Sequence, residues 1–212
     1  LPKIVAGELL TALALDEHTS HNPSKIATTA TKVDGGYSLN GSKTFVLDGH
    51  IADLLIVAAR TSGKTDGEQG ISLFLVDANA KGLSVARTIM VDSRNSSNIQ
   101  FYNVVVAEDA LLGELDQGFK GLDSVLDIAR IGIAAEMLGS MQAVFESIVE
   151  FLKQREQFGV LIGSFQGLQH RAAEMYSEIE LCKSAVRAAL AGLDDPGTTQ
   201  VEIAELASMT KA

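Results

Sequence analysis

Residues 34–49 read DGGYSLNGSKTFVLDG, and this stretch decides the fold predicted for the first half of the chain. Two runs suited to strands, Tyr37–Leu39 and Lys43–Leu47, lie between three turn signals of the Asp-Gly or Asn-Gly type. Glycine after aspartate or asparagine favours the tight turns that join antiparallel strands. The stretch therefore predicts two short strands of an antiparallel sheet.

The same pattern extends on both sides, from Leu13 to about Val106. Runs rich in β-branched and aliphatic residues alternate there with turn signals, at a spacing that favours a barrel or a sandwich. Neither a βαβ alternation nor a Gly-x-Gly-x-x-Gly motif after a strand is found, which argues against a Rossmann domain. The expected strands are Leu10–Leu15, Ile26–Val33, Tyr37–Leu39, Lys43–Leu47, Leu54–Arg60, Ile71–Val76, Leu83–Ile89 and Asn98–Val106.

From about Leu115 the apolar residues recur every three or four positions, which predicts long amphipathic helices. The first helix is expected to reach a break at Phe158, and Ser164 could cap a second helix that stops near Gly192. Thr199-Gln200-Val201-Glu202 has the form of a capping box, so a third helix should begin there.

These two periodicities predict the fold class α+β with two domains. Residues 1–110 should form an antiparallel β-barrel or sandwich, and residues 111–212 an incomplete antiparallel helical bundle. The apolar residues of the third helix need a surface to cover. We therefore expect the sequence to be a fragment whose bundle has further helices.

Charge, the length of apolar runs and the cysteine count argue against several classes of protein. The chain has 17 basic and 27 acidic residues, and its acidic excess disfavours nucleic-acid binding. The longest uninterrupted apolar run, Leu54 to Ala59, is far shorter than the roughly 18 residues typical of a membrane span, so none is expected. Cys182 is the single cysteine and no signal-peptide pattern opens the sequence, which predicts a cytoplasmic location.

The most specific stretch for chemistry runs from Arg155-Glu156-Gln157-Phe158-Gly159 to Ser164-Phe165-Gln166. A guanidinium beside the free amide groups of a helix start suits a pyrophosphate. The alternative is a capped turn between helices with an exposed arginine.

Other candidates also have two interpretations. Asp127 and Arg130 lie three residues apart, on one face of the expected helix. They could form an ordinary ion pair, or Asp127 could orient Arg130 as an anchor for a polar ligand. Phe45 could stack on a flat cofactor or belong to the core. The spacing His18-x-x-His21 invites a metal interpretation, but further ligands at a characteristic spacing are missing, so no metal site is expected.

Four stretches together resemble the acyl-CoA dehydrogenase family, in the right order and over nearly the whole chain: Leu39-Asn40-Gly41-Ser42-Lys43, Ile71-Ser72-Leu73-Phe74-Leu75-Val76, Asp127-Ile128-Ala129-Arg130 and residues 155–166. The resemblance implies the middle β-domain of that fold, followed by the first helices of its C-terminal four-helix bundle. It also implies FAD, dimers or tetramers, and removal of the α and β hydrogens of an acyl-CoA thioester. Electrons would pass to an electron-transferring flavoprotein.

The resemblance also implies roles for individual residues. The residues that would flank the flavin ring are Leu15, Asp16, Phe45, Val46 and Leu47. Those that would contact FAD across a subunit interface are Arg155, Phe158, Phe165 and Gln166. Those that would meet the acyl-CoA are Asn22, Asp127 and Arg130.

Several positions depart from the family pattern. Family members commonly carry Thr-Glu-Pro followed by Gly-Ser-Asp where this chain has Asp16-Glu17-His18 to Pro23, so Asn22 approximately replaces a serine that often touches the ligand. Phe45 replaces the usual tryptophan, Leu47 replaces a threonine that hydrogen-bonds the ring, and Ala129 occupies a position where some members carry the catalytic glutamate. No catalytic base is assigned. The leading interpretation is FAD-dependent oxidation of an acyl-CoA to the 2,3-enoyl-CoA. The alternatives are a non-catalytic FAD/CoA-binding subunit of a heteromeric complex and an oxygen-using flavoenzyme of the same fold.

Overall fold

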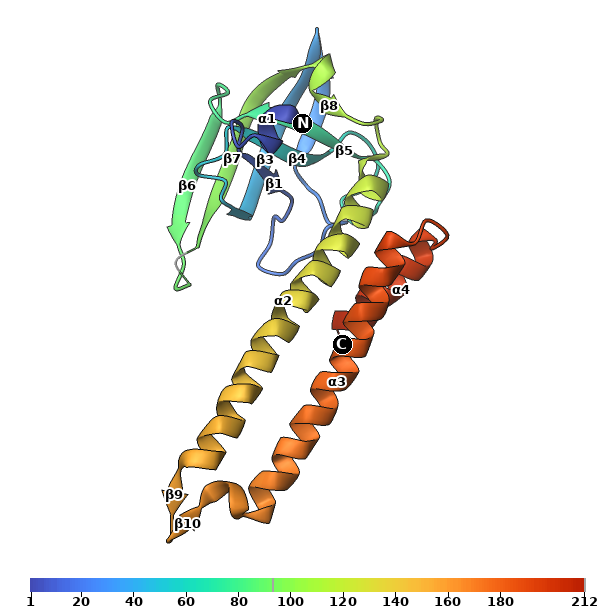
Figure 1. Ribbon diagram of the computed structural model, residues 1–212. Helices are drawn as coiled ribbons and strands as arrows, with labels where there is room; N and C mark the ends of the chain where they lie inside the picture. The colour runs from blue at the N-terminus through green and yellow to red at the C-terminus, as the bar shows by residue number, and fades with distance from the viewer. Residues whose placement is uncertain (93, 212) are drawn as a thin grey trace. The chain divides into compact units, whose positions relative to one another are not determined.

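The computed structural model describes residues 1–92 and 94–211, and it divides the chain into two compact units, Leu1–Leu122 and Asp123–Ala212. The first unit is rich in strands and the second is helical (Figure 1). Together they confirm the predicted class of a β-domain followed by helices.

The first unit contains one sheet of eight strands. Their order is β6-β7-β3-β2-β4-β5-β8, and β1 pairs with β4. Most pairings are antiparallel, as predicted, while β1 and β2 both run parallel to β4. The strands are β1 (Thr11–Ala14), β2 (Thr29–Val33), β3 (Gly36–Leu47), β4 (Leu54–Arg60), β5 (Ile71–Asp77), β6 (Leu83–Ile89), β7 (Asn95–Ala107) and β8 (Leu111–Leu112), with a short helix α1 (Pro2–Val5) before them.

The sheet curls around one apolar core. Tyr37 on β3 and Phe74 on β5 have ring centroids 5.0 Å apart, although β2 and β4 separate their strands in the sheet. Side chains from both halves of the sheet therefore meet inside it. The largest apolar side chains buried there are Leu39, Val46, Leu55, Val57, Phe74, Val76, Ile99 and Phe101.

The two strands predicted over Tyr37–Leu39 and Lys43–Leu47 are in fact one strand, β3. Its pairing with β7 shifts register between Leu39 and Gly41 and again between Lys43 and Val46. The prediction was wrong because the Asn-Gly pair forms a bulge instead of a turn when β7 supplies hydrogen-bond partners on both sides. Gly41 has φ 146, and a Cβ there would lie 2.6 Å from Thr28 Oγ1.

The strand predicted from Ile26 begins only at Thr29. Several of the preceding backbone groups bond to side chains, although Thr28 O still accepts a hydrogen bond from Arg60 N of β4 at 2.8 Å. Ala27 N and Thr28 N donate to the Glu17 carboxylate, and Ile26 O accepts a hydrogen bond from Arg60 Nε at 2.9 Å. This difference is important for the site described below.

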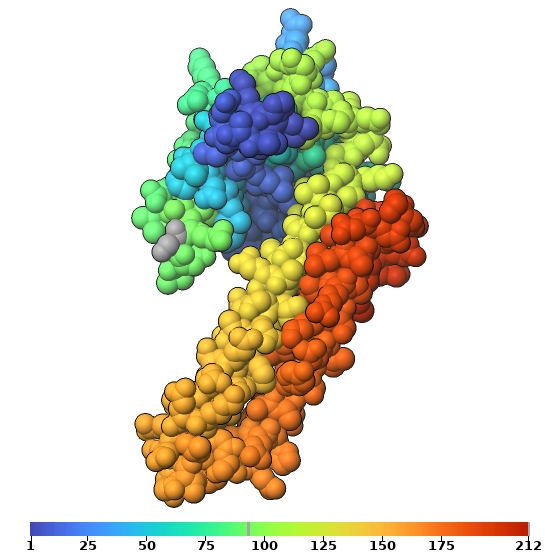
Figure 2. All heavy atoms as spheres, in the orientation of Figure 1, coloured from blue at the N-terminus to red at the C-terminus, as the bar shows by residue number. Residues whose placement is uncertain are grey.

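The second unit contains most of α2 (Gly118–Gln154) together with α3 (Gln166–Asp194) and α4 (Gln200–Lys211). The short strands β9 (Glu156–Gln157) and β10 (Val160–Leu161) form the hairpin between α2 and α3. Figures 1 and 2 show α2 and α3 side by side, and the rings of Phe145 and Tyr176 lie 6.0 Å apart between them. A small core joins Ile131, Ala189 and Ala207 from the three helices.

The predicted helix ends are partly confirmed. Thr199 N donates to Glu202 Oε2 at 2.7 Å and Glu202 N donates to Thr199 Oγ1 at 3.3 Å, so the capping box is present. Ser164 does not cap α3. Its Oγ donates to Leu161 O at 2.7 Å within a turn of 3₁₀-helix, and α3 begins at Gln166.

The helix α2 meets the length and composition test for a membrane span, with an 18-residue window of mean hydropathy 1.2 that is 6% buried. A bundle helix with an exposed apolar stripe passes the same test, so this result alone is weak support for a membrane span. The absence of a membrane span therefore stays a prediction.

Candidate functional site

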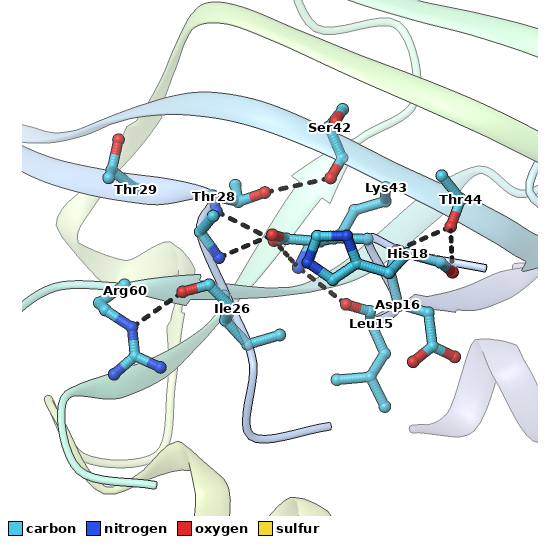
Figure 3. A network of polar contacts seen from close by, with 12 residues as sticks. Leu15, Asp16, His18, Ile26, Thr28, Thr29, Ser42, Lys43, Thr44 and Arg60 are labelled. Carbon is cyan, nitrogen blue, oxygen red and sulfur yellow. Dashed lines mark hydrogen bonds and ion pairs between the residues drawn. The ribbon is translucent and has the colours of Figure 1, made fainter. Parts of the chain in front are cut away.

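The first candidate site in the β-rich unit centres on a buried ion pair. Lys43 on β3 and Glu17 after β1 have side chains that are 0% and 5% exposed, and Lys43 Nζ donates to Glu17 Oε1 at 2.8 Å. The same ammonium donates to Leu15 O at 2.9 Å. Figure 3 shows these contacts at the centre of a larger polar network.

The Glu17 carboxylate closes a loop. It accepts hydrogen bonds from Ala27 N at 2.6 Å and Thr28 N at 2.9 Å, so it ties the end of β1 to the start of β2. We call Glu17, Lys43 and their bonds to Leu15, Ala27 and Thr28 the Glu17–Lys43 clasp. Its acceptors and donors are mainly backbone groups, which the fold must satisfy once they are buried.

Burial and charge determine the protonation of the pair. Burial by itself would raise the pKa of Glu17, but the Lys43 charge and hydrogen bonds from Lys43 and Thr28 outweigh it, and the pKa is lowered. Burial lowers the pKa of Lys43 to about 8, although the carboxylates of Glu17 and Asp16 oppose this shift. Both groups are therefore charged at neutral pH.

The structure brings several of the predicted site residues together beside the clasp. Thr44 N donates to Asp16 O at 2.7 Å, which joins Asp16 to the strand that carries Phe45, Val46 and Leu47. The Asp16 carboxylate lies 2.9 Å from His21 Nδ1 and accepts Asn22 N at 3.3 Å. Asn22 thus lies next to Asp16, whereas the side chain of Leu15 belongs to the buried core.

The strand after Lys43 presents an apolar surface. Phe45 and Leu47 are 57% and 50% exposed, while Val46 between them is buried. Phe45 adopts φ 53, a left-handed conformation that is uncommon outside glycine. It is therefore not the core phenylalanine of the alternative interpretation, and its ring is free to contact a flat ligand.

In the helical unit, Asp127 and Arg130 form the expected ion pair on α2. Asp127 is 3% exposed and Arg130 reaches solvent. The second Asp127 oxygen accepts Gln200 Nε2 from α4 at 3.2 Å. A buried carboxylate that accepts from two donors holds the Arg130 guanidinium in place more firmly than a surface pair would.

The hairpin between α2 and α3 brings the remaining predicted residues together. Ile162 N donates to Arg155 O at 2.8 Å, and the rings of Phe158 and Phe165 lie 6.4 Å apart. Arg155 and Gln166 are exposed, and none of the described residues forms an ion pair with Arg155. An exposed guanidinium of this kind can bind a phosphate group.

The two candidate sites of the helical unit are far apart. Asp127 and Arg155 are separated by 28 positions, nearly all within α2, which corresponds to roughly 42 Å along the helix axis. The same small ligand cannot contact both ends of that helix. The hairpin and the Asp127–Arg130 pair are therefore two distinct sites.

Sequence analysis missed several residues of these networks. Glu17 and Lys43 had no assigned roles as a pair, Thr28 had no role, and Gln200 was seen only as part of the capping box. One signal for a buried lysine was present in the sequence, since Lys43 follows Tyr37 and Leu39 at even spacing, and these residues are buried on the same strand. Among residues 1–92 and 94–211, no group of three or more possible metal ligands is found.

Comparisons with known proteins match the β-rich part and the helical part of the chain to two domains of one family. The family description "Acyl-CoA dehydrogenase, middle domain" matches residues 12–104, and "Acyl-CoA dehydrogenase, C-terminal domain" matches residues 116–212. The acyl-CoA dehydrogenase of Bacillus subtilis is 37% identical over 190 residues, which cover 88% of this chain and 50% of that protein.

Solved structures are similar over nearly the whole chain. The butyryl-CoA dehydrogenase of Megasphaera elsdenii has a TM-score of 0.83 and 34% identity, with 98% of this chain and 56% of that chain covered. The FAD complex of PigA has a TM-score of 0.88 and 28% identity, with coverages of 99% and 56%. The chain spans about half the length of the curated relatives it matches.

Proposed function

This chain belongs to the acyl-CoA dehydrogenase family, and on that basis we propose that it is part of an FAD-dependent enzyme that oxidises an acyl-CoA thioester to the 2,3-enoyl-CoA. The observation that carries the proposal is the direct hydrogen bond of 2.7 Å between Thr44 N and Asp16 O. It joins the two segments, Leu15–Asp16 and Phe45–Leu47, that would flank a flavin ring.

The exposed apolar side chains beside that bond fit a flavin. Phe45 and Leu47 offer a flat apolar contact, and the buried Val46 anchors the strand between them. Leu47 carries no side-chain donor, so a hydrogen bond to the ring from this position would come from the backbone. When bound, FAD would supply the hydride acceptor, and the chain's residues would hold the ring and exclude water.

The hairpin fits the phosphate side of the cofactor. Arg155 would pair with the diphosphate, and Gln166, Phe158 and Phe165 would contact the rest of FAD. Since the hairpin lies roughly 42 Å along α2 from the other helical site, we propose that it serves the FAD of a second copy. Self-association as a dimer or tetramer would then be part of the function.

In the helical unit the acyl-CoA would meet Asp127 and Arg130, and Asn22 is the residue of the β-rich unit proposed to bind substrate. The Asp127 carboxylate orients the Arg130 guanidinium, and a fixed guanidinium suits the phosphates of CoA. No residue of this chain is proposed as the catalytic base, because Ala129 has no titratable group. The contribution of these residues is to position the thioester for proton removal at Cα and hydride loss from Cβ.

The proposal also includes an electron acceptor and a location. An electron-transferring flavoprotein would accept the electrons, and the protein would work in the cytoplasm.

Residues 1–110 and 111–212 would be the middle and C-terminal domains of the enzyme. Since the site would be assembled from several walls, the isolated 212 residues should retain little or no FAD.

The test uses the full-length protein reconstituted with FAD. Flavin absorbance that bleaches on addition of acyl-CoA thioesters is the expected result. Arg155→Ala should weaken FAD retention about tenfold or more, because a hydrogen bond between charged groups contributes roughly 1.5–3 kcal/mol. Arg171→Ala, on an exposed position of α3, is the matched control and should retain FAD. Absence of both flavin and bleaching in the unmodified protein would refute the proposal.

A second candidate function is a non-catalytic subunit that binds FAD and CoA within a heteromeric complex. The departure from the family pattern at Asp16, the missing side-chain donor at Leu47 and the missing carboxylate at Ala129 favour it. Bound FAD without bleaching by any acyl-CoA would support this alternative. Peroxide formation during turnover would instead indicate an oxygen-using flavoenzyme.

A further inference from the structure

Each partner of the Glu17–Lys43 clasp is adjacent in sequence to a segment proposed to contact the flavin. Leu15 and Asp16 immediately precede Glu17, and the segment Phe45–Leu47 begins two residues after Lys43. The clasp thus lies where the two segments approach each other. Neither of its side chains is accessible enough to contact a ligand, since they are 0% and 5% exposed.

Several hydrogen bonds join the two segments at this point. Lys43 Nζ donates to Glu17 Oε1 at 2.8 Å and to Leu15 O at 2.9 Å, and Thr44 N donates to Asp16 O at 2.7 Å. The Thr44 hydroxyl adds longer bonds to Asp16 O at 3.5 Å and to His18 O at 3.3 Å. The strand β1, which ends at Ala14, pairs with β4 and not with β3. The spacing between Leu15–Asp16 and β3 is therefore determined by these bonds and not by a β-ladder.

Stability alone does not account for the pair. A buried ion pair is often no more stabilising than well-packed apolar residues of the same volume, because removing two charges from water is costly. The hydrogen bonds of this pair go to the backbone of Leu15, Ala27 and Thr28, at both ends of one loop. Such bonds determine where a backbone lies, which an apolar pair could not do.

We infer that the Glu17–Lys43 clasp is a positioning element for the flavin, which holds the backbone of Leu15 and Asp16 at a fixed distance from Phe45–Leu47. The inference rests on the proposed function for its flavin. Glu17 and Lys43 act through the segments that they hold and are positioning residues, not catalytic ones. Loss of the clasp would change the contacts of oxidised and reduced flavin unequally, because the two forms differ in shape and charge.

The test compares Glu17→Gln and Lys43→Met with Lys32→Met in the full-length protein. Glu17→Gln keeps the shape of the side chain and removes its charge. Lys32 is the matched control, since it also forms an ion pair on the β-rich unit but is 55% exposed. The midpoint potential of bound FAD is measured, together with amide hydrogen exchange over residues 15–28 of the FAD-free protein.

Both clasp variants should change the ratio of affinities for oxidised and reduced flavin about tenfold, which is a shift of about 30 mV for a two-electron couple. The amides of Ala27 and Thr28 should exchange about tenfold faster or more. Lys32→Met should match the unmodified protein in both measurements. Lys43→Arg, which keeps a charge and donors, should recover part of the change in potential.

Unchanged potential in clasp variants that fold and bind FAD would overturn the inference, even if their melting temperatures fall. If one clasp variant fails to fold, the other variant decides by the same measurement. Failure of the proposed function would look different, because the unmodified protein would then bind no FAD. In that case, unchanged exchange at Ala27 and Thr28 would overturn the inference by itself, and faster exchange would support its positional part.

Discussion

The β-rich unit and the helical unit differ in how much of their apolar surface they cover themselves. Among the described residues, the core of the sheet contains sixteen buried apolar residues that contact one another, whereas the core shared by the three helices consists of Ile131, Ala189 and Ala207, with Ile179 and Val186 also buried on α3. Apolar side chains exposed on α2 include Val125, Ile128, Ile133, Met137, Val144 and Phe151. The sheet therefore completes its core within this chain, and the helices need further apolar surface.

This difference extends to the candidate sites. In the β-rich unit, the site backbone is held by buried charges and hydrogen bonds, as the Glu17–Lys43 clasp shows. In the helical unit, Arg155 and Gln166 are exposed, next to the hairpin and at the start of α3. The comparison predicts that mutations in the sheet act on the fold, and that mutations on the helices act mainly on association or binding.

The largest expected effect compares a core residue of the sheet with an exposed apolar residue of α2. Phe74→Ala in the sheet should lower the free energy of unfolding by about 3–5 kcal/mol, because it removes a fully buried ring and leaves a cavity. Phe151→Ala, on a residue of α2 that is 58% exposed, should change it by less than about 0.5 kcal/mol. Denaturant unfolding of both variants measures the difference, and equal losses would contradict the comparison.

A smaller effect follows from the pKa of Lys43. The folded chain lowers this pKa from 10.5 to about 8, so between these values the unfolded chain binds more protons at Lys43 than the folded one. This side chain therefore makes stability rise with pH over that window, by up to about 3 kcal/mol. Unfolding from pH 7 to 11 measures the rise, and Lys43→Met should remove it.

Glu17, Asp16 and Arg60 also influence the charge of Lys43, and their effects are already part of its lowered pKa. Lys32→Met is the control for the pH series, because its ammonium lies in an exposed ion pair with Glu108. The same rise of stability in Lys43→Met as in the unmodified protein would mean that Lys43 is not the group responsible.

The smallest effect concerns local interactions in the helical unit. Thr199→Ala removes the side-chain oxygen that accepts Glu202 N, so it should lower stability by about 1 kcal/mol through fraying of α4. Ser208→Ala, on an exposed position of the same helix, is the control. Circular dichroism during thermal unfolding measures both, and an unchanged midpoint for Thr199→Ala would show that α4 is held by packing alone.

Much of the fold could be predicted from the sequence because the signals are local. The change of apolar period near Leu115 separates strands from helices, and the capping box at Thr199 marks the start of α4 to the residue. The candidate residues Asp16, Asn22, Asp127 and Arg130 also lie in contact as pairs. Their roles toward FAD and acyl-CoA stay predictions.

Other features depended on hydrogen-bond partners that compete with the local preference, one distant in the sequence and one nearby. The Asn40-Gly41 pair has a strong local turn preference, yet pairing with β7 makes it a bulge. Ser164 has the chemistry of a helix cap, yet its hydroxyl bonds to Leu161 O and α3 begins two residues later. In both cases a nearby hydrogen-bond acceptor or strand decided the outcome, and neither is visible in the local pattern.

The sequence by itself determined the order of strands and helices, their approximate bounds and the family to which the chain belongs, since periodicity and motifs are properties of neighbouring residues. Only the tertiary structure decided that Lys43 lies buried against Glu17, that β1 and β2 run parallel to β4, and that Phe45 faces solvent. These outcomes depend on contacts between groups that are distant in the sequence. Glu17 and Lys43, for example, are 26 positions apart, and each must compensate the charge of the other once both are removed from water.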